Sequence, residues 1–169
     1  MNPRPLEDFL TDCVTPEFQA SWLFLARIEN SCRSAAEARA PLTVSPGIYD
    51  DSDPAIVFQG AWLQDKVWPQ TYFHTVTYTN LPGSKVRFAF RGAMLTYVYT
   101  RAANRGKADI TIDGVRRATL DLYSPSAEWQ SRTSFKVAAG QHLAVITILP
   151  DKNPKSADRF IDVDAFEVQ

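Results

Sequence analysis

The chain has 169 residues, a length typical of a single domain or of a domain with an appendage. Its composition, 45% hydrophobic and 12% aromatic, suffices for a substantial core and argues against disorder. The 18 basic and 19 acidic residues leave a net charge of −1, which gives no electrostatic reason to expect nucleic acid or an anionic membrane as a partner. The first residues, MNPRPLEDFL, lack the apolar stretch of a signal peptide, and no apolar run approaches the ~20 residues of a membrane span. The compartment therefore stays open.

Residues 1–47 are predicted to form an N-terminal α-helical segment and a linker. Thr15 offers a capping oxygen and Pro16 suits the first helical position, and residues 16–39 contain no further Pro and no Gly. One apolar stripe recurs at helical spacing, made of Phe18, Trp22, Leu25 and Ile28. A lone helix cannot bury such a stripe by itself. The stripe is therefore predicted to pack on the following domain, on a second copy of the chain as a homodimer, or on a parent domain.

Residues 48–169 are predicted to form one antiparallel β-sandwich, a mainly β jelly roll. Short strand-like runs are separated by turn signals, and no alternation of strands with helices points to a parallel sheet. Apolar and basic side chains alternate along residues 85–91, and Asp113-Gly114 is a strong hairpin turn signal. The expected strands cover residues 55–59, 72–79, 85–91, 94–100, 108–113, 115–122, 128–137, 142–149 and 160–168.

The last expected strand, residues 160–168, breaks its own period. Its apolar residues fall on two faces of a regular strand, Ile161 and Val163 on one and Phe166 and Val168 on the other. A bulge near Asp164-Ala165 would turn all four side chains inward.

Several motifs occur in an order that resembles a bacterial module. They are YDDSDPAIVFQGAW (49–62), RAANRGKADITIDG (101–114), LDLYSP (120–125), KNPKS (152–156) and FIDVDAFEV (160–168). The module is similar to the galactose-binding-like jelly rolls, the fold class of many non-catalytic carbohydrate-binding modules. Such modules usually occur as appendages of larger extracellular or glycan-processing proteins. Over residues 48–169 the resemblance implies a jelly-roll fold and sugar binding without a reaction.

The resemblance also implies a structural calcium ion where the first and last strands meet. The DDSD and DVD stretches lie at those chain positions, and calcium takes about six to eight oxygen ligands, many of them carboxylates. The alternative is that Asp53-Pro54 forms a turn and that the other acids meet water or pair with Arg159. The candidate ligands are Asp51, Asp53, Asp162 and Asp164.

A sugar site needs an aromatic platform for the apolar face of a pyranose ring, with polar groups around it. Trp68 lies in a polar, Pro-containing loop, and Trp129 stands between Glu128 and Gln130 just after the SPSA loop. Both are therefore candidate platforms. Core packing is the alternative for each of them and for the other candidates, Trp62, Tyr72 and Tyr123.

Polar groups for the same site are expected from two loops. In the Asn104-Arg105-Gly106 motif, Arg105 would fork onto sugar hydroxyls or a uronate carboxylate, or it would tie the loop to Asp109 or to the acidic C-terminal strand. Gly106 is expected to adopt a positive φ in a turn. The second loop, which would cluster with Tyr123 at one end of the fold, contributes Lys152, Asn153 and Arg159.

Motifs for catalysis are missing from the sequence. It contains no Gly-x-Ser-x-Gly elbow, phosphate loop or Gly-x-Gly-x-x-Gly run. His74, expected in mid-strand, has no Ser or Asp partner by spacing, and His142 follows a turn; a structural or surface role is expected for each. The leading prediction is therefore a non-catalytic carbohydrate-binding module. The alternatives are a structural or dimerisation module that binds no sugar, and a small glycan-active enzyme whose site is assembled from scattered residues.

Overall fold

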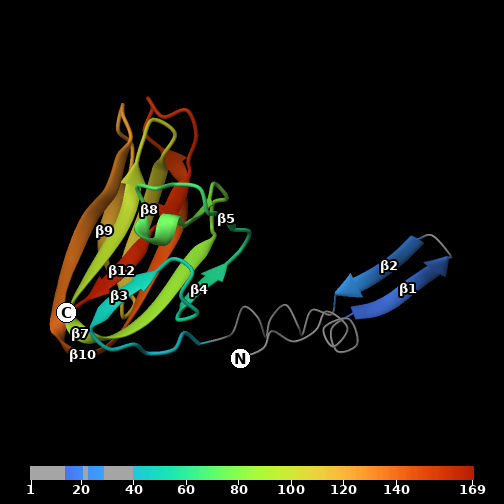
Figure 1. Cartoon of the computed structure of the whole chain (residues 1–169), viewed down its shortest axis with the longest axis horizontal. Helices are drawn as coiled ribbons and strands as arrows, with labels where there is room; N and C mark the ends of the chain where they lie inside the picture. The colour runs from blue at the N-terminus through green and yellow to red at the C-terminus, as the bar shows by residue number, and fades with distance from the viewer. Residues whose placement is uncertain (1–13, 21–22, 29–39) are drawn as a thin grey trace. The chain divides into compact units, whose positions relative to one another are not determined.

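The computed structural model describes residues 14–20, 23–28 and 40–169. The chain separates into two compact units, residues 1–40 and residues 41–169. Figure 1 shows the strands of both units in chain order, coloured from blue to red. Among the described residues, no helix has the length and apolar character that a membrane crossing requires.

In the first unit the structure describes a β-hairpin in place of the predicted helix. β1 (Val14–Ala20) pairs antiparallel with β2 (Leu23–Ile28), with a register shift next to Pro16. The helix prediction is wrong for these residues, because aromatic and β-branched side chains favour strands and their spacing also fits a hairpin. A Pro is tolerated beside a strand irregularity. The rest of the predicted helix, including Trp22 and residues 29–39, lies outside the described residues.

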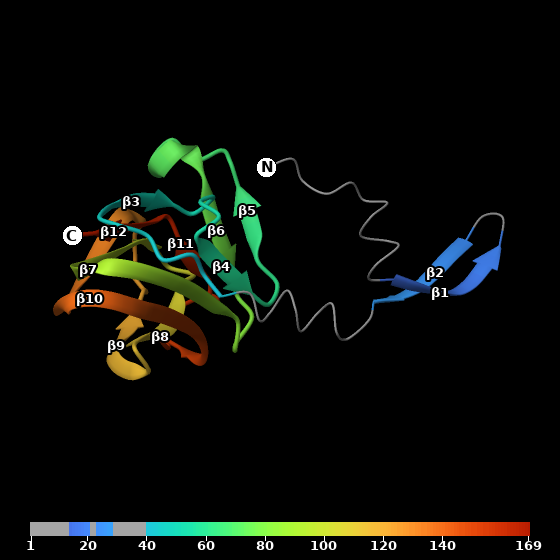
Figure 2. The same ribbon diagram turned by 90° about the horizontal axis from the view of Figure 1, so that it is seen from below.

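The second unit is built of antiparallel β-sheets, which confirms the predicted mainly β class. The larger sheet has seven strands in the order β3–β12–β7–β10–β8–β9, with β4 pairing with the first part of β7, and the smaller sheet has the order β11–β6–β5. Figure 2 shows β7 and β10 curving side by side, with β5 and β6 in the other layer. The larger sheet contains β3 (Gly47–Asp50), β4 (Ile56–Gln59), β7 (Lys85–Arg101), β8 (Gly106–Ile112), β9 (Val115–Asp121), β10 (Glu128–Lys152) and β12 (Ala165–Val168). The smaller sheet contains β5 (Leu63–Asp65), β6 (Val76–Thr79) and β11 (Ile161–Val163).

The two longest strands each join two segments that were predicted to be separate. β7 runs through Gly92 without a break, and β10 runs through Gly140 with a register shift between Lys136 and Gly140. These two glycines lie opposite each other in the ladder. A Cβ on Gly92 would come within 2.5 Å of the Gln169 carbonyl oxygen, so the glycine there admits a close backbone approach rather than a turn.

The hydrophobic core lies between the two sheets. Phe88 and Phe166 stack with ring centroids 4.6 Å apart, which joins β7 to the C-terminal strand. Alternation along β7 is as predicted, because Val86 and Phe88 are buried while Lys85 is exposed. Both sheets contribute fully buried side chains, including Ile110, Ile112, Ile146, Ile148, Ile161 and Val163.

The last predicted strand is divided between the two sheets. β11 pairs with β6 in the smaller sheet, and β12 pairs with β3 and β7 in the larger one. Asp164 lies between them, and a strand that changes sheets needs such a break. The four apolar residues are all buried, as predicted, although the cause is the change of sheet rather than a bulge in one strand: Ile161, Val163, Phe166 and Val168.

Of two turns, the sequence predicted the one at Asp113-Gly114 and missed the one at residues 72–74. Asp113 and Gly114 adopt positive φ values of 53° and 74°, which confirms the predicted hairpin turn between β8 and β9. The prediction of a strand from residue 72 is wrong, because a short 3₁₀ turn, η1 (Tyr72–His74), precedes β6. Phe73 and His74 have φ values of 45° and 64° there, so His74 is not in mid-strand.

Candidate functional site

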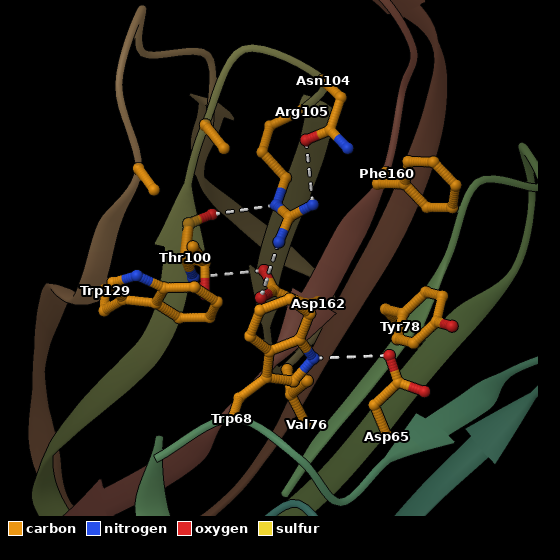
Figure 3. Close-up of a pocket in the computed structure, with 12 residues that line it drawn as sticks. Asp65, Trp68, Val76, Tyr78, Thr100, Asn104, Arg105, Trp129, Phe160 and Asp162 are labelled. Atoms are coloured by element: carbon orange, nitrogen blue, oxygen red, sulfur yellow. Dashed lines mark hydrogen bonds and ion pairs between the residues drawn. The ribbon is translucent and has the colours of Figure 1, made fainter. Parts of the chain in front are cut away.

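A cavity of roughly 270 Å³ opens where the smaller sheet meets the β7–β8 loop and the start of β10. Figure 3 shows its lining side chains, which come from β5, β6, β7, β10 and β11 and from the loops beside them. Four of the predicted ligand residues meet here: Trp68, Asn104, Arg105 and Trp129. We refer to this cavity as the end pocket.

Two tryptophans form one wall of the end pocket. The rings of Trp68 and Trp129 lie with centroids 5.2 Å apart and an interplanar angle of 34°. Trp68 is 38% exposed, and its Nε1 donates to an Asp65 carboxylate oxygen at 3.4 Å. Its loop is closed by Thr71, whose backbone N–H and hydroxyl donate to the Trp68 carbonyl at 3.1 and 2.8 Å. These rings are therefore partly open to solvent and held in place by local bonds.

Trp129 owes its direction to an irregularity at the start of β10. The register between β10 and β7 shifts between Glu128 and Ser131, and Gln130 has a positive φ of 51°. An irregularity of this kind turns a side chain away from the regular alternation of the strand. The local backbone is therefore what brings Trp129 to the end pocket.

The opposite side of the end pocket carries a second aromatic pair. Tyr78 on β6 and Phe160 before β11 lie with ring centroids 5.9 Å apart, edge to face. The sequence did not indicate that these two residues line a pocket, because a Tyr in an alternating strand and a Phe at a strand start are usually core residues. Asp65 and Thr100 are two further lining residues that the sequence did not predict.

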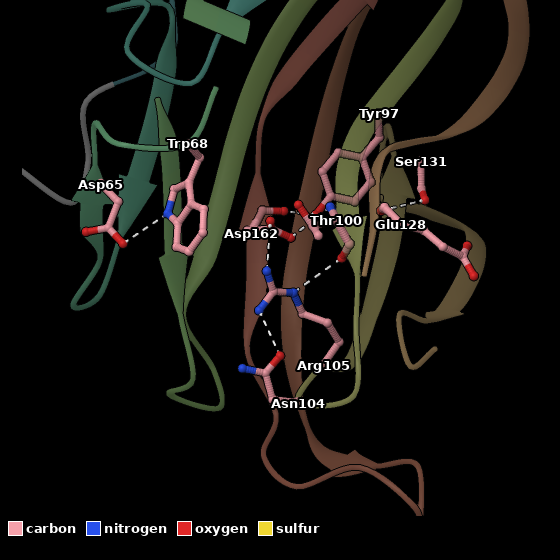
Figure 4. Close-up of polar contacts among 9 residues, drawn as sticks. All are labelled: Asp65, Trp68, Tyr97, Thr100, Asn104, Arg105, Glu128, Ser131 and Asp162. Carbon is pink, nitrogen blue, oxygen red and sulfur yellow. Dashed lines mark hydrogen bonds and ion pairs between the residues drawn. The ribbon is translucent and has the colours of Figure 1, made fainter. Parts of the chain in front are cut away.

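A buried ion pair forms the polar floor of the end pocket (Figure 4). Asp162 is 0% exposed; its carboxylate accepts from Arg105 at 3.3 Å and from the Thr100 backbone N–H at 3.1 Å. Arg105 also donates to the Thr100 carbonyl at 3.3 Å and to the Asn104 side-chain oxygen at 3.1 Å. Of the two alternatives for Arg105, the structure therefore shows the tie to the C-terminal strand.

The loop that carries Arg105 is fixed by backbone contacts. Gly106 donates to the Phe160 carbonyl at 3.0 Å, and Phe160 donates to the Asn104 carbonyl at 3.1 Å. A Cβ on Gly106 would lie 2.6 Å from the Arg159 carbonyl oxygen. The expected positive φ is wrong, since Gly106 is absent from the positive-φ residues of the described chain, and close packing is what requires a glycine here.

One buried hydroxyl in the end pocket lacks a partner. Thr100 is 1% exposed and lines the cavity, and its Oγ1 makes no hydrogen bond within the described part of the protein. A buried polar atom without a partner costs about 1–3 kcal/mol.

The remaining predicted ligand residues are not among those lining the end pocket: Tyr72, Tyr123, Lys152 and Asn153. The Tyr72 hydroxyl donates to the Glu167 carboxylate on β12 at 3.1 Å. The Lys152 ammonium donates to two carbonyls of its own loop at 2.8 and 3.1 Å, and the Asn153 amide donates to a carboxylate at the end of β9 at 2.9 Å. The side chains of Tyr72, Lys152 and Asn153 therefore tie strands and loops together.

The structure does not bring the four predicted calcium ligands together. Asp162 faces Arg105 in the end pocket. Asp53 accepts from the Ala55 backbone N–H at 2.8 Å, which is the turn that was the alternative prediction. Within residues 40–169 and the described strands before them, no three Asp, Glu, His or Cys side chains are arranged as a metal site.

Asp51 and Asp164 do lie in one place, beside Asp50. The Asp51 N–H donates to the Asp164 carbonyl at 2.9 Å, and the Thr75 hydroxyl contacts the Asp50 and Asp51 carboxylates at 3.1 and 2.5 Å. Asp164 is fully buried, and its Oδ2 has no hydrogen-bond partner among the described residues. Burial, together with the charges of the neighbouring aspartates, raises the pKa of Asp164 to about 7, although the bond from the Tyr72 N–H acts in the opposite direction. Burial also raises the pKa of Asp51.

Comparisons with known proteins agree with this fold. No family model matches the chain. The chain is 36% identical over 96 residues to an A type blood N-acetyl-alpha-D-galactosamine deacetylase from Flavonifractor plautii, a match that covers 55% of this chain and 12% of the deacetylase. A xanthan lyase from Paenibacillus matches over 76% of this chain and 13% of its own, with 15% identity and a TM-score of 0.59.

A family 35 carbohydrate-binding module from Clostridium thermocellum matches along nearly its whole length. The match covers 72% of this chain and 95% of the module, with 14% identity and a TM-score of 0.53. At this identity the likeness shows the fold alone. This confirms the predicted resemblance: the chain has an antiparallel β-fold like that of a carbohydrate-binding module, and it spans only about an eighth of the deacetylase and of the lyase.

Proposed function

We propose that residues 41–169 bind a carbohydrate in the end pocket and catalyse no reaction, as a module of, or a partner to, a glycan-processing protein. The observation that carries the proposal is the convergence of two tryptophans with bonded polar groups in one cavity. Trp68 and Trp129 offer indole faces to the apolar face of a pyranose ring. Asn104 offers its amide group to the sugar hydroxyls.

The size of the end pocket sets the scale of the ligand. Its volume of roughly 270 Å³ lies near the lower end of the about 300–1,000 Å³ of ordinary ligand pockets. The predicted residues of the second loop stand outside the lining. One terminal or branching sugar unit therefore fits the cavity better than an extended chain.

The proteins to which this chain is similar support a glycan as the ligand. The Flavonifractor plautii relative is named for a deacetylase of N-acetyl-alpha-D-galactosamine, and a carbohydrate-binding module shares the fold. The small share of these larger chains that the protein spans supports a role as one part of a larger protein. The unit formed by residues 1–40 is the proposed contact to a parent domain or to a second copy. Sedimentation of the chain tests the second copy, since a monomer at every concentration would remove it.

A glycan array, followed by titration of bound glycans into single-site variants, tests carbohydrate binding. Trp68→Ala and Trp129→Ala should each weaken binding at least tenfold, about 1.4 kcal/mol, and lower the melting temperature by only a few degrees, because neither ring is fully buried. Phe73→Ala is the matched control, since this ring is 79% exposed and does not line the end pocket. Absence of binding to every glycan, or unfolding of both Trp variants, would contradict the proposal.

The absence of a reaction is tested on the same protein. Incubation with the glycans that bind, and with chromogenic esters and N-acetylated sugars, should yield no product. Turnover that disappears on substitution of Asp65 or Asp162, the two carboxylates of the end pocket, would replace this proposal with that of an enzyme.

We also propose that a calcium ion binds at Asp51 and Asp164, two of the four predicted ligands, without a third carboxylate ligand. What supports this is a fully buried carboxylate oxygen without a partner, beside other carboxylates. A cation would offset the desolvation of these charges and use backbone carbonyls and hydroxyls as further ligands.

A further inference from the structure

The end pocket carries one negative charge that no protein cation offsets. Its charged lining residues are Asp65, Arg105 and Asp162. Arg105 and Asp162 neutralise each other at 3.3 Å. Asp65 accepts a long bond, 3.4 Å, from the Trp68 indole N–H and interacts with the Tyr78 hydroxyl, but both groups are neutral, and Asp65 forms no ion pair in the described part of the chain. The lining therefore has a net charge of −1, and Asp65 supplies it.

This carboxylate lies among aromatic rings. Trp68 donates to it, and Tyr78 lies close enough that the Asp65 charge adds to the effect of burial in raising the pKa of the Tyr78 hydroxyl. Figure 3 shows the Asp65 carboxylate joined to the Trp68 indole nitrogen, with the Tyr78 ring on the other side of that carboxylate. A carboxylate combined with aromatic faces is the environment that binds an ammonium group, by an ion pair and by cation–π attraction within about 6 Å of a ring centroid.

Arg105 does not give the end pocket an opposite preference. Its guanidinium is 14% exposed and is bound to a carboxylate that is 0% exposed. A sugar carboxylate could take this guanidinium only by leaving Asp162 buried without its partner, which is strongly unfavourable. A uronate would also meet the charge of Asp65.

We propose that the end pocket selects a sugar unit with a free amino group, such as a 2-amino-2-deoxyhexose, over its N-acetylated, neutral and carboxylated counterparts. The selection rests on the carbohydrate binding proposed above. The ammonium of the sugar pairs with Asp65, and the ring of the same sugar lies against Trp68 or Trp129. N-acetylation removes the charge, so the ion pair is lost.

The test compares galactose with three sugars that each differ from it in one group: galactosamine, N-acetylgalactosamine and galacturonic acid. They are titrated into the full chain by NMR or calorimetry at about pH 6, where the amine is protonated, and at low ionic strength. Galactosamine should bind about tenfold more tightly than galactose, and galacturonic acid more weakly than either. Added salt should reduce the galactosamine advantage, because it screens a partly exposed ion pair.

Asp65→Asn separates the charge from the hydrogen bond. The amide oxygen can still accept from the Trp68 N–H, so Asp65→Asn should remove the tenfold preference for galactosamine over galactose. Asp151→Asn is the matched control, because it removes the same charge from an exposed position on β10 outside the end pocket and should retain the preference.

The outcomes distinguish this inference from the function on which it rests. Equal binding of galactosamine and galactose, tightest binding of galacturonic acid, or a preference that survives Asp65→Asn overturns the amine selection and leaves carbohydrate binding intact. Failure of all four sugars overturns the amine selection, and failure of the glycan array as well overturns both.

Discussion

Replacing Arg105 with alanine should destabilise the protein strongly, although this residue lies at the edge of a pocket. Arg105 is the cation that neutralises Asp162, whose side chain is completely buried. The substitution leaves that carboxylate with only the bond from the Thr100 N–H. It also removes the bonds from Arg105 to the Thr100 carbonyl and to Asn104, which hold the β7–β8 loop.

The expected loss can be worked out from burial. Removing one partner of a buried ion pair costs about 3–5 kcal/mol. The lower end, about 3 kcal/mol, applies because the pair lines a cavity that water can enter. For a folded unit of residues 41–169 each kcal/mol lowers the melting temperature by about 3–5 °C, so a fall of about 10 °C is expected.

Chemical denaturation and calorimetry of the variant measure this loss. Arg116→Ala is the matched control, since Arg116 is 68% exposed and pairs with Asp109 at 3.8 Å, and an exposed pair contributes at most about 1 kcal/mol. Asp162→Asn added to Arg105→Ala should recover part of the loss, because it removes the unpaired charge. A melting temperature within about 2 °C of the parent for Arg105→Ala would refute the reasoning.

Two further predictions concern ions and protons. If Asp51 and Asp164 bind calcium, a chelator should lower the melting temperature and added calcium should restore it, whereas an unchanged midpoint would remove the calcium proposal. The bond from Asp113 raises the pKa of His142 and lowers that of Asp113, so the pair should stabilise the fold fully between the ordinary values, 3.8 for Asp and 6.5 for His. The stability difference between the parent and His142→Gln should therefore shrink as pH rises through the raised pKa of His142 or falls through the lowered pKa of Asp113; a constant difference from about pH 5 to 8 would contradict this.

Patterns that act over a few residues were sufficient for the class of fold. Alternation along residues 85–91, the Asp113-Gly114 turn and the inward-facing residues of the last strand are consequences of local backbone preference and period. The same kind of evidence failed for the N-terminal segment, because an apolar spacing of three or four residues fits a helix and a hairpin alike. It also failed at Gly92 and Gly140, which lie within continuous strands rather than at strand ends, Gly92 because of a close backbone approach and Gly140 next to a register shift.

The composition of the end pocket was foreseen only in part. Trp68, Asn104, Arg105 and Trp129 were candidates by residue type, and the structure places them together. The sequence could not separate them from Tyr72 or Lys152, which are of the same types but bond elsewhere. Chemical type is a property of one residue, whereas membership of a site is a property of the packing.

By itself the sequence determined that this protein has an antiparallel β-fold that resembles a carbohydrate-binding module. Only the tertiary structure decided that Arg105 pairs with Asp162, 57 residues later, and that Asp65 lines the end pocket without an ion pair to any described residue. The reason is physical. Local preferences fix turns and strands, but the register between distant strands, set by the packing of the whole core, determines which charges meet.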